Sequence, residues 1–190
     1  AGGNFGTSIT YRQDVLVLIA DRLPATLELG SLAMLIACAA GGLAGVVSAA
    51  RHGRWVSSLI DGLAAIVQSI PDFLWGLIFI LIFGVLLPWL PISGRLDPLL
   101  SQDAGTGFIL LRNALDGRFD IVGSILIHML APALALALPV AAMLSRVLKA
   151  SMQEALASDY VMLARLKGLG GTRVLLAEAL PNAVTPTLSL

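Results

Sequence analysis

Charged and aromatic side chains are scarce in this sequence of 190 residues. Asp, Glu, Lys and Arg together make up 13% of it and aromatic residues 6%, whereas hydrophobic residues make up 57%. The mean hydropathy is +0.90. Soluble globular chains are about 45–50% apolar, so a water-soluble fold has no room to bury this much apolar surface. Leu, Ala, Ile, Val and Gly carry the excess, which is typical of transmembrane helices that pack closely.

Cysteine is nearly absent, and neither sign of charge is in excess. The single cysteine, Cys38, lies inside an apolar run, which excludes a disulfide framework or a cysteine-based metal cluster within the chain. We interpret it as a small buried hydrophobic residue. Lys plus Arg and Asp plus Glu number 12 each, and this balance indicates no nucleic-acid partner.

Two further signals are missing. No GxxxxGKS or GxxxxGKT phosphate loop occurs, so the chain does not itself bind ATP by that mechanism. The start of the sequence has neither the positive charge nor the short apolar core of a signal peptide. The first residue is Ala1 rather than Met, and Leu190 lies in an uncharged stretch. We therefore expect a fragment truncated at both ends, with any targeting information upstream.

Several nearly uncharged runs are long enough to cross a membrane as helices. A helix of about 20 residues at ~1.5 Å per residue spans a hydrocarbon core of ~30 Å. The predicted transmembrane domain, residues 24–190, contains spans near 29–50, 72–94 and 121–145 and the start of another at 173–190. Residues 1–23 form an external or interfacial lead-in, in which Tyr11 to Leu23 are spaced like a short helix on the membrane surface.

A proline interrupts the pattern at the start of the second span. The segment from Trp55 to Pro71 is moderately apolar and holds Asp61 and Gln68. A proline inside a helical pattern ends or kinks the helix. We therefore predict an amphipathic helix on the cytoplasmic side that runs into the second span and is broken near Ile70-Pro71.

The positive-inside rule orients these spans, because Lys and Arg near span ends are retained in the cytoplasm. Arg51 and Arg54 form a basic turn after the first span, and the loop at 146–172 is also basic. Both regions are predicted to be cytoplasmic. The loop at 95–120 and the N-terminal segment are then external.

Polar and small residues within the spans have a functional and a structural interpretation. Gly41 and Gly45 form a GxxxG pair, which we expect to mediate helix packing. His128 is ionisable at membrane depth and is therefore a candidate proton relay or ligand. No second His, Cys or suitably spaced carboxylate accompanies it, and we interpret it as a packed, neutral histidine.

Residues at the start of the second span are candidates for lining a pathway. The possible pathway residues are Gln68, Ser69, Pro71 and Asp72. For Asp61, Gln68 and Asp72, a solvated or capping role at interfacial depth is the alternative.

The segment after Lys149 favours a helix but is too charged to enter lipid. One apolar face is predicted at positions i, i+4, i+7 and i+8, namely Leu156, Tyr160, Leu163 and Ala164. A helix with such a face needs a groove to bind. We predict that Asp159 caps the turn that begins at Tyr160. Gly168 is expected to end the helix in a left-handed conformation.

This segment resembles the cytoplasmic loop of the membrane subunits of bacterial ABC importers. That loop carries Glu-Ala-Ala, three residues, Gly, nine residues, Ile, one residue and Leu-Pro. Here Gly168 is followed by nine residues and then by Glu178-Ala179-Leu180-Pro181, which keeps the spacing. Met162 and Leu163 stand where the family has Glu and the first Ala, whereas Ala164 matches.

The residues that differ from the general family pattern resemble those of the dipeptide, oligopeptide and nickel branch of that family. The local matches are Asp159-Tyr160-Val161, Ala164-Arg165 and Lys167-Gly168-Leu169. The upstream matches are Asn4-Phe5-Gly6-Thr7-Ser8, Tyr11, Arg22-Leu23-Pro24-Ala25-Thr26-Leu27, Gly45-Val46, Ser69-Ile70-Pro71-Asp72-Phe73 and Leu90-Pro91-Ile92-Ser93-Gly94. The resemblance covers essentially the whole sequence and lacks the family's first span, part of its first external region and its end.

The resemblance implies an all-α, polytopic membrane helical bundle of the type I-like ABC importer class in the bacterial inner membrane. It implies a permease half that pairs with a second, homologous permease subunit, two cytoplasmic ATPase subunits and an external solute-binding protein. Coupling to the ATPase would fall to Asp159, Tyr160, Ala164, Arg165, Lys167 and Gly168. The chain would be no enzyme and would bind no cofactor, because ATP and Mg would be held by the partners.

Several functions remain open at this point. The branch handles di- and oligopeptides, glutathione-like peptides and nickel complexes, and the lack of metal-ligand clusters favours peptides. A channel that opens without ATP, an intramembrane enzyme and a passive scaffold are alternatives from other classes. Nothing in the sequence places Ser, His and Asp as a triad, which argues against a hydrolase. Copurification with an ATPase followed by uptake assays separates these classes.

Overall fold

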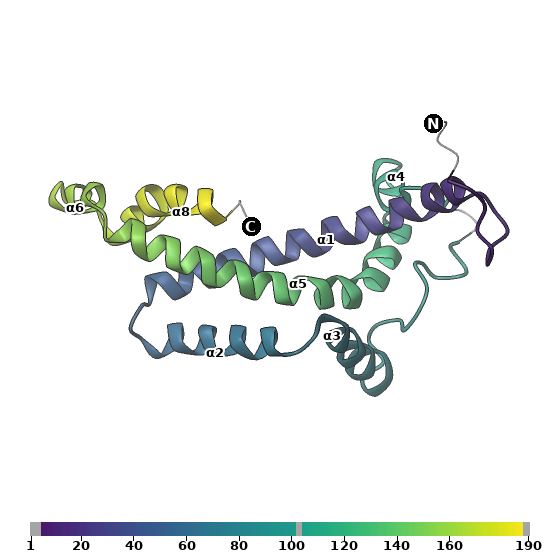
Figure 1. Cartoon of the computed structure of the whole chain (residues 1–190), viewed down its shortest axis with the longest axis horizontal. Helices are drawn as coiled ribbons and strands as arrows, with labels where there is room; N and C mark the ends of the chain where they lie inside the picture. The colour runs from purple at the N-terminus through teal and green to yellow at the C-terminus, as the bar shows by residue number, and fades with distance from the viewer. Residues whose placement is uncertain (1–4, 102–103, 188–190) are drawn as a thin grey trace. The chain divides into compact units, whose positions relative to one another are not determined.

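The computed structural model describes residues 5–101 and 104–187, and the regular structure over these residues is helical. The helices in chain order are α1 Val15–Ala50, α2 Trp55–Ser69, α3 Asp72–Phe79, the π-helix η1 Ile80–Leu86, α4 Ile109–Leu115, α5 Phe119–Leu156, α6 Asp159–Leu166, α7 Gly171–Arg173, the π-helix η2 Val174–Ala179 and α8 Leu180–Thr187 (Figure 1). The extended contacts are limited to an isolated bridge between Thr7 and Asp14 in this described part. The predicted all-α class is confirmed.

Two of the helices in the described ranges, α1 and α5, are long and apolar enough to cross a membrane. A third candidate is the pair formed by α2 and the segment Asp72–Leu86, which is bent at a short break. These lengths and compositions agree with a polytopic membrane protein, since about 20 apolar residues suffice for one span.

The chain divides into two compact units. The first comprises the described residues up to Ala33 together with Gly76–Leu134, and the second comprises Met34–Trp75 together with the described residues from Ala135 onward. Both long helices therefore contribute one half to each unit.

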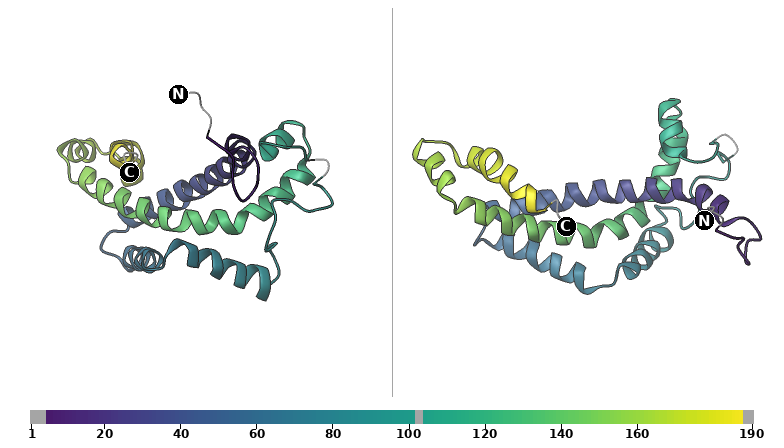
Figure 2. Two further views of the ribbon diagram at one scale, coloured as in Figure 1. Left: turned by 45° about the vertical axis from the view of Figure 1, so that its right-hand side comes forward. Right: turned by 45° about the horizontal axis from the view of Figure 1, so that its top comes forward.

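The core of the first unit joins both long helices to the segment between them. Its buried residues are Ala104, Ile109, Ile121, Ile125 and Met129, and Leu29, Leu32, Leu96, Leu100 and Leu110 pack against them. The predicted external loop at 95–120 is therefore a packed segment that contains α4. Figure 2 shows α4 in two further views, beside the first half of α5.

The second unit is built on a close approach of α1 and α5. A Cβ added to Gly41 would lie 2.6 Å from the carbonyl oxygen of Ala141, and one added to Gly45 would lie 3.0 Å from the Cβ of Leu148. Glycine is required where backbones approach this closely. The hydroxyls of Ser48 and Ser57 form a buried hydrogen bond of 3.0 Å between α1 and α2.

A cluster at the C-terminal end of the second unit joins four elements. Its buried residues are Ala49, Leu148, Met152 and Ala183, with Val46, Leu175, Leu180 and Val184 packed against them. These residues come from α1, α5, η2 and α8. Figures 1 and 2 show α8 alongside the last turns of α5.

Several predicted boundaries differ from the structure. Helix α1 begins at Val15, so Pro24 lies inside it rather than in its first turn, and residues 15–23 are not a separate surface helix. Transmembrane helices tolerate such a proline because other groups satisfy the freed carbonyl. Helix α5 continues to Leu156 through the predicted loop start at 146. The helix that begins at Asp72 ends at Leu86, because the chain then turns back and Trp89 and Leu90 donate backbone N–H groups to the Phe83 carbonyl.

Cys38 was predicted to be buried, and this prediction is wrong because its side chain is exposed. The packed stripe of α1 runs through Ala33, Ala37 and Gly41, which repeat every four residues along one face. Cys38 follows Ala37 and therefore points away from that face.

Candidate functional site

Helix α6 begins one residue earlier than the sequence pattern indicated. Ser158 occupies the N-cap position with an extended backbone, φ −79° and ψ 156°, and no side chain caps the helix. The Ser158 hydroxyl donates instead to the Ala155 carbonyl. The predicted capping role of Asp159 is therefore wrong. Asp159 lies in the first turn, where its charge is favourable to the helix dipole.

The C-terminus of α6 is fixed by Gly168. Its φ is +80°, so the predicted left-handed conformation is confirmed. The Gly168 N–H donates to the Arg165 carbonyl at 2.9 Å, and the Leu169 N–H donates to the Ala164 carbonyl at 3.2 Å. These two bonds form a Schellman motif, which satisfies carbonyls at a helix end and favours glycine because other residues are strained there.

The buried face of α6 differs from the predicted one. Val161 and Ala164 are 0% and 7% exposed, and they pack with Leu156, Leu169 and Val174. Tyr160 and Leu163 lie outside this cluster and are exposed. The reason is tertiary, since the chain after Gly168 folds back and covers the Val161 side.

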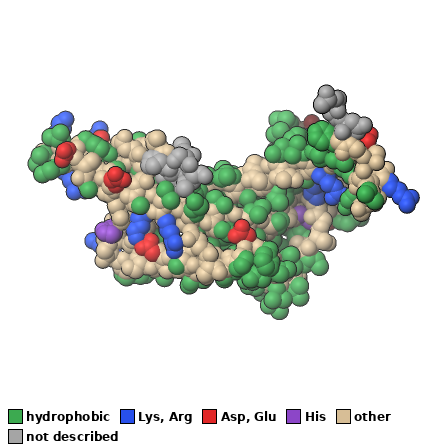
Figure 3. Space-filling model, in the orientation of Figure 1, with side chains coloured by type: hydrophobic (Ala, Val, Ile, Leu, Met, Phe, Trp, Pro, Cys, Tyr) green, Lys and Arg blue, Asp and Glu red, His purple; other side chains and the backbone are tan. Residues whose placement is uncertain are grey.

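The rest of the α6 surface presents apolar side chains to the outside. The exposed apolar residues are Tyr160, Met162, Leu163 and Leu166, with exposed fractions of 39%, 63%, 57% and 74%. Asp159, Arg165, Lys167 and Gly168 are also exposed. Figure 3 shows apolar, basic and acidic side chains together at the end of the second unit where α6 lies. The exposed surface of α6 therefore carries both apolar and charged side chains.

Three polar contacts connect the C-terminal half of α5 with α2 and with the turn before it. Lys149 forms an ion pair with Asp61, and Arg146 Nη1 donates to Gln68 Oε1 at 2.7 Å. Gln153 Nε2 lies 2.6 Å from His52 Nδ1, in the turn before α2. Figure 3 shows basic, acidic and histidine side chains gathered on this face of the second unit.

The break after α2 lies where the proline pattern predicted it. Ile70 is extended, with φ −101° and ψ 127°, as expected for a residue before proline. The Ser69 hydroxyl donates to the Ile66 carbonyl at 2.8 Å, and Asp72 lies in the first turn of α3. The indole Nε1 of Trp75 donates to the Val67 carbonyl at 3.2 Å. We call residues Ile66 to Trp75 the joint.

Sequence reasoning missed a buried carboxylate in the first unit. Glu28 in α1 is 6% exposed and accepts a hydrogen bond of 2.6 Å from Arg95. Its other oxygen accepts from the N–H groups of Leu110 and Leu111 at 2.9 and 3.3 Å. The N-cap position of α4 is held by Phe108, which has no polar side chain, so Glu28 caps α4 from another helix. The only sequence signal was a charge bordering an apolar run.

His128 is half-buried in α5. Its Nδ1 lies 2.8 Å from the Ser124 carbonyl oxygen. A carbonyl can only accept, so Nδ1 carries a proton and donates. This contact agrees with the interpretation as a packed histidine.

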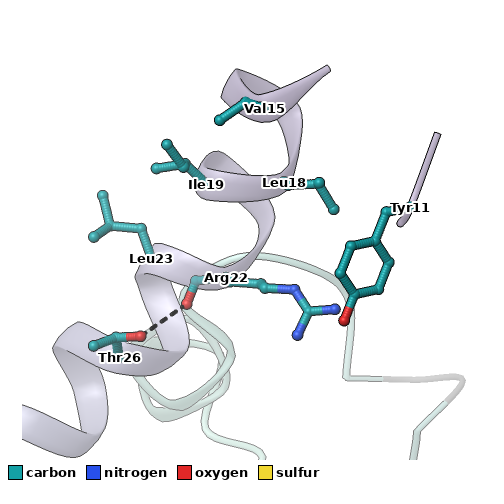
Figure 4. A pocket seen from close by; sticks show the side chains of 7 residues that line it. All are labelled: Tyr11, Val15, Leu18, Ile19, Arg22, Leu23 and Thr26. Carbon is teal, nitrogen blue, oxygen red and sulfur yellow. Dashed lines mark hydrogen bonds between the residues drawn. The ribbon is translucent and has the colours of Figure 1, made fainter. Parts of the chain in front are cut away.

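A pocket of about 430 Å³ lies on one face of α1 in the first unit. Figure 4 shows Val15, Leu18, Ile19 and Leu23 along its wall, with Tyr11 opposite Arg22. The Arg22 guanidinium carbon lies 5.2 Å from the Tyr11 ring centroid, within the range of a cation–π contact. This contact holds the segment before α1 against the helix.

Comparison with known proteins places the chain in a family. Residues 41–190 match the family described as binding-protein-dependent transport system inner membrane component. The chain is 39% identical over 190 residues to the di/tripeptide transport system permease protein DppB of Pseudomonas aeruginosa, strain UCBPP-PA14, covering 100% of this chain and 56% of that protein.

Two relatives come from Escherichia coli K12. The probable D,D-dipeptide transport system permease protein DdpB is 38% identical over 189 residues, and the dipeptide transport system permease protein DppB is 36% identical over 195 residues. Each match covers 99% of this chain and 56% of the relative, so the chain spans about half the length of these proteins. With a family match over residues 41–190, the chain belongs to the binding-protein-dependent transport system inner membrane component family.

Proposed function

We propose that this chain acts as a membrane-spanning permease subunit of an ATP-driven importer and forms half of the pathway for di- or oligopeptides. One observation carries the proposal. Relatives named for dipeptide or di/tripeptide transport match the chain at 33–39% identity over 99–100% of its residues. The family is one of transport permeases rather than enzymes.

Separate ATPase subunits are the proposed energy source, since the family is one of binding-protein-dependent transport systems and this sequence has no phosphate loop of its own. Helix α6 is the proposed docking element, and the coupling residues are Asp159, Tyr160, Ala164, Arg165, Lys167 and Gly168. Support comes from the exposed apolar residues of α6, which include Tyr160 and Leu166. An amphipathic helix whose apolar face is exposed binds into a groove of a partner.

Membership of a binding-protein-dependent transport family supports the proposed partner set. A second permease subunit completes the pathway, two cytoplasmic ATPase subunits drive it, and an external solute-binding protein delivers the peptide. Closure of the ATPase pair displaces α6, and this displacement reorients the spans in a rigid-body movement. Gln68, Ser69, Pro71 and Asp72 remain the proposed pathway residues, with Gln68 held by Arg146.

Peptide is the proposed substrate rather than nickel. The matched relatives are named as transporters of dipeptides or di/tripeptides. In the described residues, no group of three His, Cys, Asp or Glu side chains is arranged to hold a metal ion. A bare metal ion would need such ligands along its path.

The test is reconstitution of the full-length permease with its partners in proteoliposomes. The expected result is uptake of a labelled dipeptide that requires ATP and the binding protein, together with copurification of the ATPase subunits. Dipeptide uptake that proceeds equally without ATP would favour a channel. ATP-dependent uptake of nickel with no uptake of dipeptide would replace the substrate assignment.

A further inference from the structure

The joint between α2 and α3 is closed by a hydrogen bond that the backbone cannot supply. In a continuous α-helix, the Val67 carbonyl would accept from the N–H of residue 71. Residue 71 is proline, which has no N–H. The indole N–H of Trp75 donates to this carbonyl instead, with Nε1 3.2 Å from the oxygen.

Other groups of the joint are also satisfied locally. The Ile66 carbonyl accepts from the Ser69 hydroxyl at 2.8 Å, and the Pro71 carbonyl accepts from the Leu74 N–H at 3.0 Å. Trp75 is half-buried. The break is therefore a defined structure made of specific contacts, in which the first turn of α3 is tied to the last turn of α2.

The same end of α2 is attached to α5. Gln68, the residue after Val67, accepts from Arg146 at 2.7 Å, and Asp61 pairs with Lys149 further along α2. Helix α5 ends at Leu156, which packs against the buried face of α6. Within the second unit, contacts therefore lead from α6 through α5 and α2 to the joint.

We propose that Trp75 is a positioning residue of the transporter, whose indole N–H replaces the missing N–H of Pro71 and fixes the joint. When the joint is fixed, the segment after Pro71 moves together with α2. When the joint is loose, α2 moves without moving that segment. This proposal rests on the proposed function, because the movement is the one that the ATPase drives. Trp75→Phe takes the indole donor away from the Val67 carbonyl, and a carbonyl left unsatisfied is costly where its surroundings exclude water.

The first experiment compares two tryptophans of the same region. Trp75→Phe keeps an aromatic ring and removes the N–H, and Trp55→Phe makes the same change at a side chain that is 76% exposed at the start of α2. Each full-length variant is reconstituted with its partners, and dipeptide uptake per ATP hydrolysed is measured. We expect Trp75→Phe to lower this ratio at least about fivefold and Trp55→Phe to leave it within about twofold.

The second experiment tests whether Trp75 stands in for the proline N–H. Pro71→Ala allows α2 to continue through Ile70, which is extended when proline follows it, and residue 71 then donates its N–H to the Val67 carbonyl. The loss of the indole N–H should matter less in that background. We expect Trp75→Phe to lower the melting temperature of the purified complex by at least about 2 °C with Pro71 present, and by less than half as much with Ala at that position. A double-mutant cycle isolates this interaction.

Each outcome decides a part of the proposal. An unchanged uptake ratio in Trp75→Phe overturns the positioning role, and equal melting shifts in both backgrounds overturn the replacement of the proline N–H. If Trp75→Phe fails to fold and so does not accumulate in the membrane, the double variant Pro71→Ala, Trp75→Phe is expected to accumulate normally. If the double variant does not accumulate either, the idea that the indole N–H replaces the proline N–H is overturned. An absence of ATP-dependent uptake in the wild type contradicts the proposed function instead, while the melting cycle still tests the joint.

Discussion

The carboxylate of Glu28 and the guanidinium of Arg95 form an ion pair of 2.6 Å in the first unit. Glu28 is 6% exposed and Arg95 31% exposed. Arg95 also donates to the Gly107 carbonyl at 3.2 Å, and Glu28 caps α4. One carboxylate therefore fixes both the start of the segment at 95–118 and the helix within it to α1.

Glu28→Gln is expected to destabilise the full-length protein by about 1–3 kcal/mol, because it leaves the half-buried Arg95 cation without its counterion. Asp116→Asn is the control, since Asp116 and Arg112 form an exposed pair at 3.9 Å whose loss should cost about 0–1 kcal/mol. Limited proteolysis in detergent is the measurement. Faster cleavage between Arg95 and Arg118 is expected for Glu28→Gln, and equal rates in both variants would contradict the anchoring role.

Gly41→Ala should destabilise the packing of α1 on α5 by about 1–3 kcal/mol. The added methyl group would meet the Ala141 carbonyl oxygen at 2.6 Å, and backbone atoms cannot move aside cheaply. The neighbouring Gly42→Ala adds the same group where, apart from its own stretch of α1, no atom lies within 4 Å, and alanine favours a helix over glycine. The melting temperature should fall for the first variant and stay level or rise for the second. A fall of equal size in both would indicate that the close approach is absent.

Gly168→Val is expected to leave the permease in the membrane but to uncouple ATP hydrolysis from uptake. Valine is strained at a φ of +80° by about 1–2 kcal/mol, so the Schellman turn opens and α6 is no longer presented in one orientation. Gly170→Val is the control, because the φ of Gly170 is −65° and its surroundings are open. ATPase activity and dipeptide uptake are measured together, and normal coupling in Gly168→Val would reject the role of this turn.

Tyr160→Ala is expected to lower the affinity of the permease for its ATPase without changing the amount of permease in the membrane. The Tyr160 side chain is 39% exposed on the unpacked face of α6, and aromatic side chains dominate binding at interfaces, with losses of about 2 kcal/mol or more on truncation. Leu99→Ala removes an apolar side chain that is 88% exposed in the first unit and serves as the control. Copurification of the ATPase at normal yield with Tyr160→Ala would remove this residue from the interface.

Local chemistry made part of the structure predictable. The Gly168 turn and the break at Pro71 follow from backbone preferences that act within a few residues, and both are present. The long apolar runs likewise predicted the membrane helices. The helix-forming residues after Ser145 extended α5 beyond the predicted span, since their charges pair with α2 rather than ending the helix.

Long-range contacts made the rest unpredictable. The buried side of α6 depends on Val174, which no helical periodicity within α6 can indicate. Glu28 and Arg95 are far apart in the sequence, and so are Asp61 and Lys149. The sequence did contain a signal for the contact of Trp75. Pro71 has no N–H for the carbonyl four residues earlier, and Trp75, a possible donor, lies one helical turn after Pro71.

Site-specific photocrosslinking from α6 tests the central claim that separate ATPase subunits drive this permease. A photoreactive phenylalanine analogue is placed at Leu166, which is 74% exposed, or at Val161, which is 0% exposed, in the full-length assembled transporter. We expect a crosslink from position 166 to an ATPase subunit, with a yield that changes when ATP is added, and none from position 161. An absence of ATPase crosslinks from position 166 in a transporter that imports dipeptide would contradict the claim.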